Sequence, residues 1–129
     1  MRNPLAAAIV LFMCVELMLK AVNLITNRAV SGPALVRSNP KGKALVLAPW
    51  HGRAMIGTGE SAITCGPDNQ GVTDEEVRRF LAEVNATFPT LNLRQDEVSL
   101  VHRGVVPAVV RRGRVGLRGQ PAIIDHARD

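Results

Sequence analysis

The sequence predicts an α+β fold in which a mostly antiparallel sheet contains a β-hairpin and is covered by helices. A short aliphatic segment, residues 43–50, is followed by His51-Gly52 and a second extended segment, residues 53–58. Two extended segments joined by X-Gly are typical of a tight hairpin. Residues 73–88 then carry the clearest helix signal in the chain, and strand-like segments follow it. Helices and strands in this order favour α+β over a parallel α/β sheet.

Length and composition indicate one modest domain. The chain has 129 residues, of which 47% are hydrophobic and 21% are charged, as in globular rather than disordered proteins. Aromatic residues make up only 3%, so the core must consist mainly of aliphatic side chains. Cys14 and Cys65 lie far apart and have no C-x-x-C or metal-type spacing, which gives no support for a disulfide or zinc framework.

The N-terminal segment, residues 1–30, is interpreted as an apolar helix and its lead-in. Leu5 to Leu19 is almost continuously apolar, and Glu16 and Lys20 have the four-residue spacing of a helical ion pair. We predict a helix over residues 3–26, although its last four residues are also compatible with the start of an extended segment. Membrane association is the second interpretation, because a span needs about 20 apolar residues and Glu16 would be costly inside one.

Residues 31–42 contain Gly, Pro and several polar and basic residues, and they are predicted to form a loop. The remaining residues, 43–129, form the patterned domain. Pro49 lacks an N–H group, which places the end of the first hairpin strand at a sheet edge or a bulge. Residues 65–71 are predicted to form a second loop.

The helix predicted after this loop has both a start signal and an apolar stripe. Thr73 and Glu76 have the spacing of a capping box, in which each residue satisfies a backbone N–H of the other. Pro89 disfavours helical geometry in the residue before it and ends the helix. The apolar stripe consists of Val77, Phe80, Leu81 and Val84.

Strands are predicted in the last third of the chain at residues 97–101 and 105–110, interrupted by His102-Arg103-Gly104. A further strand is predicted at residues 114–118, where polar or small residues alternate with apolar ones. Residues 121–125 are the candidate for a last short strand.

The formal net charge is +5, and this charge suggests an anionic partner. Much of it comes from arginines near the C-terminus, namely Arg103, Arg111, Arg112, Arg114 and Arg118. Nucleic-acid binding is disfavoured, since no aromatic residues are interleaved with these arginines and no known binding module is present. A small basic nucleic-acid-binding or membrane-associated protein without enzymatic activity remains the alternative function. The same charge would suit an anionic substrate, an acidic lipid surface or a partner subunit.

No motif in the chain indicates bound nucleotide or metal. Gly57-Thr58-Gly59 has neither a third glycine nor a helix at the offsets of a dinucleotide-binding motif. His51, His102 and His126 fall on three different predicted elements, so each is interpreted as a loop or surface histidine rather than a metal ligand or general base.

A series of short motifs nevertheless resembles one enzyme family. These motifs are Pro49-Trp50-x-x-Arg53, Ile56-Gly57-Thr58, Gly66-Pro67-Asp68, Val72-Thr73-x-Glu75-Glu76, Glu83-Val84-Asn85, Phe88-Pro89, Asp96-Glu97-Val98 and Gly104-Val105-x-Pro107. In order and spacing they resemble the FAD-dependent glycerol-3-phosphate dehydrogenases, within the D-amino-acid-oxidase-like oxidoreductases. Upstream, residues 20–24 and Arg28 resemble the family's strand that enters the substrate domain. The resemblance extends from about Lys20 to Asp129.

The resemblance implies that residues 43–129 form part of a substrate-binding (cap) domain and that the FAD-binding Rossmann part lies outside this chain. The implied reaction oxidises glycerol-3-phosphate, or a related small hydroxy substrate, to dihydroxyacetone phosphate by hydride transfer to flavin. The implied cofactor, FAD, is not expected to bind this segment alone, so the chain alone is expected to be inactive. Implied partners are a phosphorylated substrate, the flavin domain and peripheral membrane contacts, in the cytoplasm or at the inner face of the cell membrane.

The sequence departs from the family at three positions. Val106 stands where the family carries the arginine of a Gly-Val-Arg-Pro motif, Asn23 replaces a common histidine, and Gly59 replaces a second threonine after Thr58. Arg103 is the first candidate for a contact to the substrate phosphate, because arginine suits bidentate phosphate binding. His102 is the second candidate, for orienting the substrate. The alternative for both is that they shape a turn before Gly104. No catalytic or metal-binding residue is assigned.

Overall fold

The computed structural model of the chain describes residues 17–61, 63–121 and 123. These residues form a six-stranded sheet with the order β2-β3-β4-β1-β5-β6, and all its neighbouring strands are antiparallel. The elements are β1 (Met18–Thr26), β2 (Leu35–Ser38), β3 (Ala44–Trp50), β4 (Arg53–Glu60), α2 (Asp74–Thr87), the 3₁₀ turn η1 (Gln95–Glu97), β5 (Val98–Arg111) and β6 (Arg114–Leu117). The predicted antiparallel α+β fold with a hairpin is therefore confirmed.

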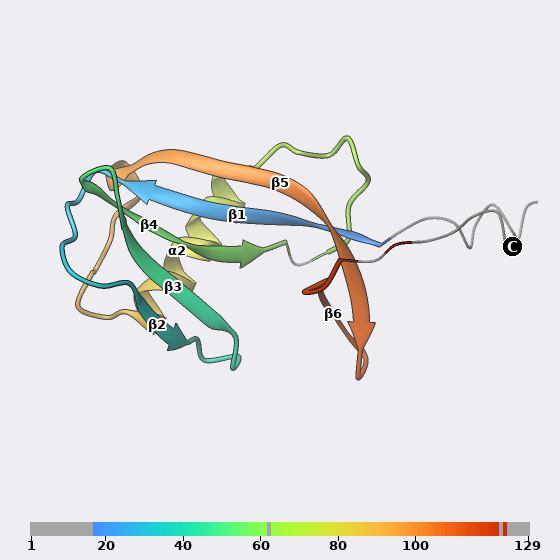
Figure 1. The fold of residues 1–129 in the computed structure, drawn as a ribbon. Coiled ribbons are helices and arrows are strands. Elements are labelled where there is room, and N and C mark those ends of the chain that lie inside the picture. Colours follow the sequence, from blue (N-terminus) through green and yellow to red (C-terminus); the bar gives the residue numbers. More distant parts are fainter. Residues whose placement is uncertain (1–16, 62, 122, 124–129) are drawn as a thin grey trace, which may run out of the picture.

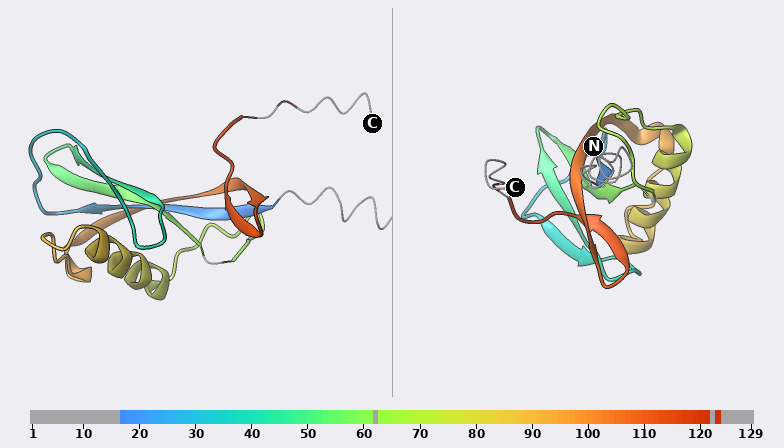
Figure 2. Two further views of the ribbon diagram at one scale, coloured as in Figure 1. Left: turned by 90° about the horizontal axis from the view of Figure 1, so that it is seen from below. Right: turned by 90° about the vertical axis from the view of Figure 1, so that its right-hand side faces the viewer.

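The sheet is strongly curved, and α2 lies along one of its faces (Figures 1 and 2). We call this the helix face and the opposite side the open face. Within the described part of the chain, α2 is the α-helix that covers the sheet; the prediction of several covering helices is not confirmed. The long strand β5 bends near its end, so that β6 turns away from the main plane of the sheet (Figure 1).

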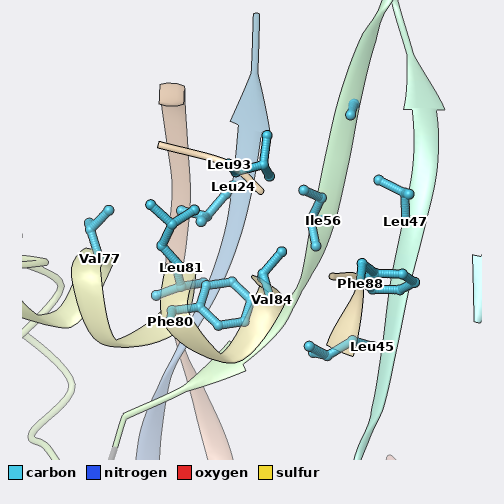
Figure 3. Close-up of a cluster of buried hydrophobic side chains, with 12 residues drawn as sticks. Leu24, Leu45, Leu47, Ile56, Val77, Phe80, Leu81, Val84, Phe88 and Leu93 are labelled. Atoms are coloured by element: carbon cyan, nitrogen blue, oxygen red, sulfur yellow. The ribbon is translucent and has the colours of Figure 1, made fainter. Parts of the chain in front are cut away.

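The hydrophobic core lies between α2 and the helix face. The predicted stripe of α2 is buried, and its side chains point toward β1, β4 and β3 (Figure 3). Leu24, Leu45 and Ile56 have no exposed surface, and neither does Val84 of the helix. Because the strands present alternate residues to each face, these aliphatic positions fix which face of each strand meets the helix.

The predicted helix and hairpin form as their local signals require. Thr73 accepts a hydrogen bond from the Glu76 backbone, and the Glu76 carboxylate accepts one from the Thr73 backbone, which confirms the capping box. In the β3–β4 turn, His51 and Gly52 have φ angles of 48° and 74°, as a type I′ turn requires. Pro49 lies beyond the part of β3 that pairs with β2, so its missing N–H faces an edge.

Residues 18–26 form the strand β1. The predicted helix is therefore wrong for residues 18–22, and the extended alternative for residues 23–26 is confirmed, as is the strand that the family resemblance implied at residues 20–24. β1 is a central strand that pairs with β4 on one side and β5 on the other. Its sheet partners satisfy the backbone of a nearly continuous apolar segment, and such a segment cannot be told from a buried helix by periodicity alone. Lys20 lies in this strand and forms an ion pair with Glu76 of α2, whereas Glu16, its predicted helical partner, lies outside the described residues. Residues 3–16 lie outside the described residues.

Three further boundaries differ from the sequence-based expectation. Residues 35–38, inside the predicted loop 31–42, form the short edge strand β2 against β3. The predicted break at residues 102–104 is absent, because β5 continues through them in regular pairing with β1. In the predicted strand 121–125, the described residues Pro121 and Ile123 are not in a strand, and the others lie outside the description.

Among the described residues, no helix has both the length and the apolar character needed to cross a membrane.

Candidate functional site

A β-bulge on the open face brings three polar or small residues together. Val22 pairs with Gly59 and Leu24 pairs with Ile56, so Asn23 on β1 lies opposite both Gly57 and Thr58 on β4. A bulge re-aims the side chains beside it. Here the Thr58 hydroxyl donates a hydrogen bond of 3.0 Å to Asn23 Oδ1.

A pocket of about 400 Å³ opens next to this bulge, a volume within the range of small-molecule sites. Its lining consists of Asn23, Lys43, Ala44, Val46, Ala48, Met55, Gly57, Thr58, Glu60 and Leu117. Most of these side chains are apolar or very small, and Asn23 and Thr58 provide neutral polar groups. The site therefore combines apolar walls with a small number of hydrogen-bonding groups.

The Asn23 amide has hydrogen-bonding capacity left over. Its oxygen accepts from Thr58, whereas its nitrogen has no hydrogen-bond partner among the described residues. A primary amide nitrogen carries two donors. Asn23 is half-buried and lines the pocket, so these donors are available to a ligand.

The rim of the pocket carries one ion pair. Lys43 Nζ lies 2.6 Å from Glu60 Oε1, and both side chains are partly exposed. The two charges cancel, so the charged groups of the lining sum to zero.

Of the two predicted substrate-binding residues, His102 lies on the open face. It pairs directly with Asn23 across the β1–β5 ladder, and residues directly opposite each other in antiparallel strands point to the same side. The His102 ring meets the Trp50 ring edge-on, with centroids 5.6 Å apart. Trp50 also contacts His51 edge-on at 4.6 Å. His102 thus belongs to a partly exposed aromatic cluster, in which Trp50 is half-buried, and it is not part of the pocket lining.

Arg103 points the other way. It pairs with Val22, which belongs to the core cluster on the helix face. Val106 alternates with His102 and Gly104 along β5, so it lies on the open face with His102. The alternative interpretation of His102 and Arg103 as turn residues is wrong, because both lie within the continuous strand β5. Their proposed contacts to substrate stay predictions.

A second cavity lies on the helix face and is much smaller. It measures about 20 Å³ and is lined partly by Lys20, Glu76 and Phe80, which gives room for about one water molecule. Beside it, Lys20 Nζ donates to both Glu76 carboxylate oxygens, at 2.9 and 3.1 Å, and to the Gly71 carbonyl at 2.8 Å. The hydrogen bond from Lys20, together with that from the Thr73 backbone, lowers the pKa of Glu76. This cluster ties the helix to β1.

Sequence reasoning found part of this site. The family resemblance pointed to Asn23 as a departure from the family pattern and to Thr58 as part of a matching motif. Met55 and the Lys43–Glu60 pair were not among the residues that the sequence indicated. No local signal marks these three, because the pocket depends on how β3, β4 and β1 are ordered in the sheet. Among the described residues, no group of three or more His, Cys, Asp or Glu side chains is placed to hold a metal ion.

The chain is an antiparallel sheet segment with one helix-covered face and one open face, and the open face carries a pocket. No family model matches the chain. A glycerol-3-phosphate dehydrogenase from Synechocystis sp. is 26% identical over 85 residues, which cover 64% of this chain and 15% of that protein. The solved structure of a glycerol-3-phosphate dehydrogenase from Bacillus halodurans, complexed with FAD, has a TM-score of 0.59 and 22% identity. That likeness covers 81% of this chain and 23% of the solved chain.

The two comparisons confirm the resemblance to the FAD-dependent glycerol-3-phosphate dehydrogenase family that the sequence motifs indicated. The likeness to the solved structure is one of fold. The aligned segment is a minor part of both relatives, 15% of one and 23% of the other.

Proposed function

We propose that this chain forms part of the substrate-binding domain of an FAD-dependent oxidoreductase. In this proposal, the enzyme oxidises glycerol-3-phosphate or a related small hydroxy compound by hydride transfer to the flavin. The observation that carries the proposal is the pocket on the open face, where Asn23 and Thr58 are positioned by a bulge in a sheet of the family's fold. The agreement between the sequence relative and the structural relative supports the same enzyme class.

In this proposal, residues 43–129 contribute to the cap domain, and β1 completes its sheet. FAD would be held by another part of the enzyme. When bound, FAD accepts the hydride and supplies the redox chemistry. The residues of this chain would bind and orient the substrate. Peripheral attachment at the inner face of the cell membrane belongs to the same proposal and rests on the resemblance alone.

Individual residues have separate proposed roles. Asn23 and Thr58 would hold a substrate hydroxyl at the bulge. His102 would orient the substrate from the neighbouring strand, beside Trp50. Arg103 is retained as a proposed phosphate contact; because it points to the helix face, such a contact would require the substrate to reach the sheet from that side.

A chimeric enzyme provides a direct test. The equivalent segment of the Bacillus halodurans dehydrogenase would be replaced by residues 17–121 of this chain, and the visible absorbance of FAD would be followed anaerobically. We expect the flavin band to bleach on addition of glycerol-3-phosphate or a related hydroxy compound. A chimera that retains FAD but is not reduced by any of these compounds would contradict the proposal. If the chimera does not retain FAD, the proposal can be tested by binding of this chain to the separately produced flavin part, with absence of binding as the contradicting result.

Binding of an anionic macromolecule is a second candidate function, favoured by the tip of the β5–β6 hairpin. Arg111 and Arg114 lie directly opposite each other, and Arg112 occupies the turn between them. Among the described residues, none of the three has an ion-pair partner. Like charges in direct cross-strand pairs repel, and a bound polyanion would relieve that repulsion. Nucleic-acid binding with a steep dependence on salt concentration, lost on replacing these arginines, would support this function.

A further inference from the structure

We infer that the open-face pocket binds a small uncharged polyol and disfavours a phosphate ester. As an assignment of substrate class, the inference rests on the function proposed above. As a statement about binding, it rests on the pocket itself. It follows from the charge, the hydrogen-bonding groups and the apolar walls of the lining.

The charge of the lining is the first argument. Lys43 and Glu60 are the charged side chains of the lining, and their ion pair of 2.6 Å leaves no net positive charge. A phosphate ester carries a charge of about −1.5 to −2 at neutral pH. Moving this charge from water into a site without a matching cation is unfavourable. To bind phosphate, Lys43 would have to give up its carboxylate partner.

The neighbouring residues of β5 add no cation to this balance, and Arg53, which alternates with Met55 along β4, donates a hydrogen bond of 2.7 Å to Ser99 Oγ. On the open face, Val106 alternates with Gly104 and His102 along β5. The arginine of that stretch, Arg103, pairs with Val22 on the helix face. Residues 102–106 therefore direct no arginine or lysine side chain toward the open face.

The hydrogen-bonding groups are the second argument. Asn23 offers two N–H donors without a partner among the described residues, and the Thr58 oxygen, which donates to Asn23, still has lone pairs to accept with. A hydroxyl group both donates and accepts one hydrogen bond at a single oxygen, so it matches this pair. A fully ionised phosphate oxygen only accepts and would leave the Thr58 oxygen without a donor.

The apolar walls are the third argument. Val46, Ala48, Met55 and Leu117 surround the polar pair. The CH groups of a polyol can contact these side chains while its hydroxyl groups face Asn23 and Thr58. An apolar wall with a few convergent polar groups is the usual composition of a small-molecule site.

The test is a ligand titration of the isotope-labelled full chain, followed by NMR, with glycerol, glycerol 3-phosphate and inorganic phosphate as the three probes. We expect glycerol to shift the side-chain amide signals of Asn23 and the methyl signals of Met55. Glycerol 3-phosphate should bind about tenfold more weakly than glycerol, which corresponds to about 1.4 kcal/mol. Inorganic phosphate should not perturb these signals.

Two variants locate the binding, a third serves as the control, and a fourth tests the effect of the ion pair at the rim. Asn23→Ala and Thr58→Val should each weaken glycerol binding, and Thr58→Val keeps the test open if Asn23→Ala does not fold. Asn69→Ala removes an exposed asparagine side chain in the loop after β4 and should leave glycerol binding unchanged. Glu60→Gln removes the partner of Lys43 and should improve the binding of glycerol 3-phosphate relative to glycerol, because a cation at the rim becomes available.

Tighter binding of glycerol 3-phosphate than of glycerol by the unmodified chain would overturn the inference. So would glycerol shifts that are unaffected by both site variants, or the absence of any shift at the pocket. The outcome is separable from that of the chimera experiment. If glycerol binds as expected while the chimera is not reduced by any hydroxy compound, the proposed function fails and the assignment of the pocket stands.

Discussion

Gly57 and Asn23 approach each other so closely across β4 and β1 that a Cβ atom on Gly57 would lie 1.7 Å from Asn23 Oδ1. The missing side chain at position 57 therefore leaves the space that the Asn23 amide occupies. Held there, Asn23 accepts the hydrogen bond from Thr58. A glycine with no chemistry of its own thus sets the geometry of the candidate site.

The first prediction follows from this contact. Gly57→Ala should displace the Asn23 side chain and cost about 1–3 kcal/mol in free energy of unfolding, because the added methyl group overpacks the bulge. Urea denaturation would measure the loss. Gly66→Ala is the matched control, since nothing lies within 4 Å of a Cβ atom at that position. The double variant Asn23→Ala/Gly57→Ala should recover part of the loss, and unchanged stability in Gly57→Ala would contradict the close approach.

The second prediction concerns the helix face. A Cβ atom on Gly59 would lie 2.6 Å from the ring of Phe80. Phe80 belongs to α2, and its ring is buried in the core between the helix and the sheet (Figure 3). Gly59→Ala should therefore destabilise the fold by about 1–3 kcal/mol, because the ring must move within a packed interface. Thermal unfolding with the Gly59→Ala/Phe80→Leu double variant tests the cause, since a smaller side chain at position 80 should reduce the penalty. Equal penalties in the two backgrounds would show that the Phe80 ring is not responsible.

The third prediction concerns pH. Lys20 and the Thr73 backbone hold the pKa of Glu76 below its ordinary value. A carboxyl whose pKa is lower in the folded state than in the unfolded state contributes stability above the unfolded pKa. That contribution is lost as the pH falls through the folded pKa. We therefore expect Glu76 to contribute at neutral pH and to stop contributing during acidification.

Lys20→Met tests this pH dependence. Removing the lysine should raise the pKa of Glu76 toward its ordinary value and flatten the part of the stability curve that Glu76 produces below neutral pH. Other carboxyls with lowered pKa, Asp96 and Glu97, should keep their share of the acid dependence. Denaturant unfolding at a series of pH values would measure the difference, and parallel curves for the two proteins would contradict the role of Lys20.

The fourth prediction concerns the start of α2. Thr73→Ala removes the side-chain oxygen that accepts from the Glu76 backbone and should cost about 1 kcal/mol. Thr73→Ser preserves the hydroxyl and should cost much less. The free energies of unfolding of the two variants, compared with the parent chain, give the measurement. A loss as large in Thr73→Ser as in Thr73→Ala would assign the effect to the methyl group instead of the cap.

The elements with local signals were predictable from the sequence. The capping box at Thr73 and Glu76 is satisfied within four residues, and the His51-Gly52 turn depends on its own backbone angles. Both features therefore depend only on residues adjacent in the sequence, and the structure confirms them. The apolar stripe of α2 likewise predicts the buried side of the helix, because it depends only on the spacing of residues within the helix. The short motifs in register indicated the family that the comparisons support.

The tertiary structure decided what depends on pairing between distant segments. Residues 18–26 are compatible in pattern with a helix, and become a strand because β4 and β5 complete their hydrogen bonds from both sides. His102 and Arg103 are adjacent in sequence, yet the register with Asn23 and Val22 sends them to opposite faces. The sequence by itself determined the caps, the turn and the apolar stripe, since these depend on near neighbours. The pocket at Asn23 and Thr58 was decided by strand order and one bulge, because its two polar groups meet only after residues 35 positions apart are paired.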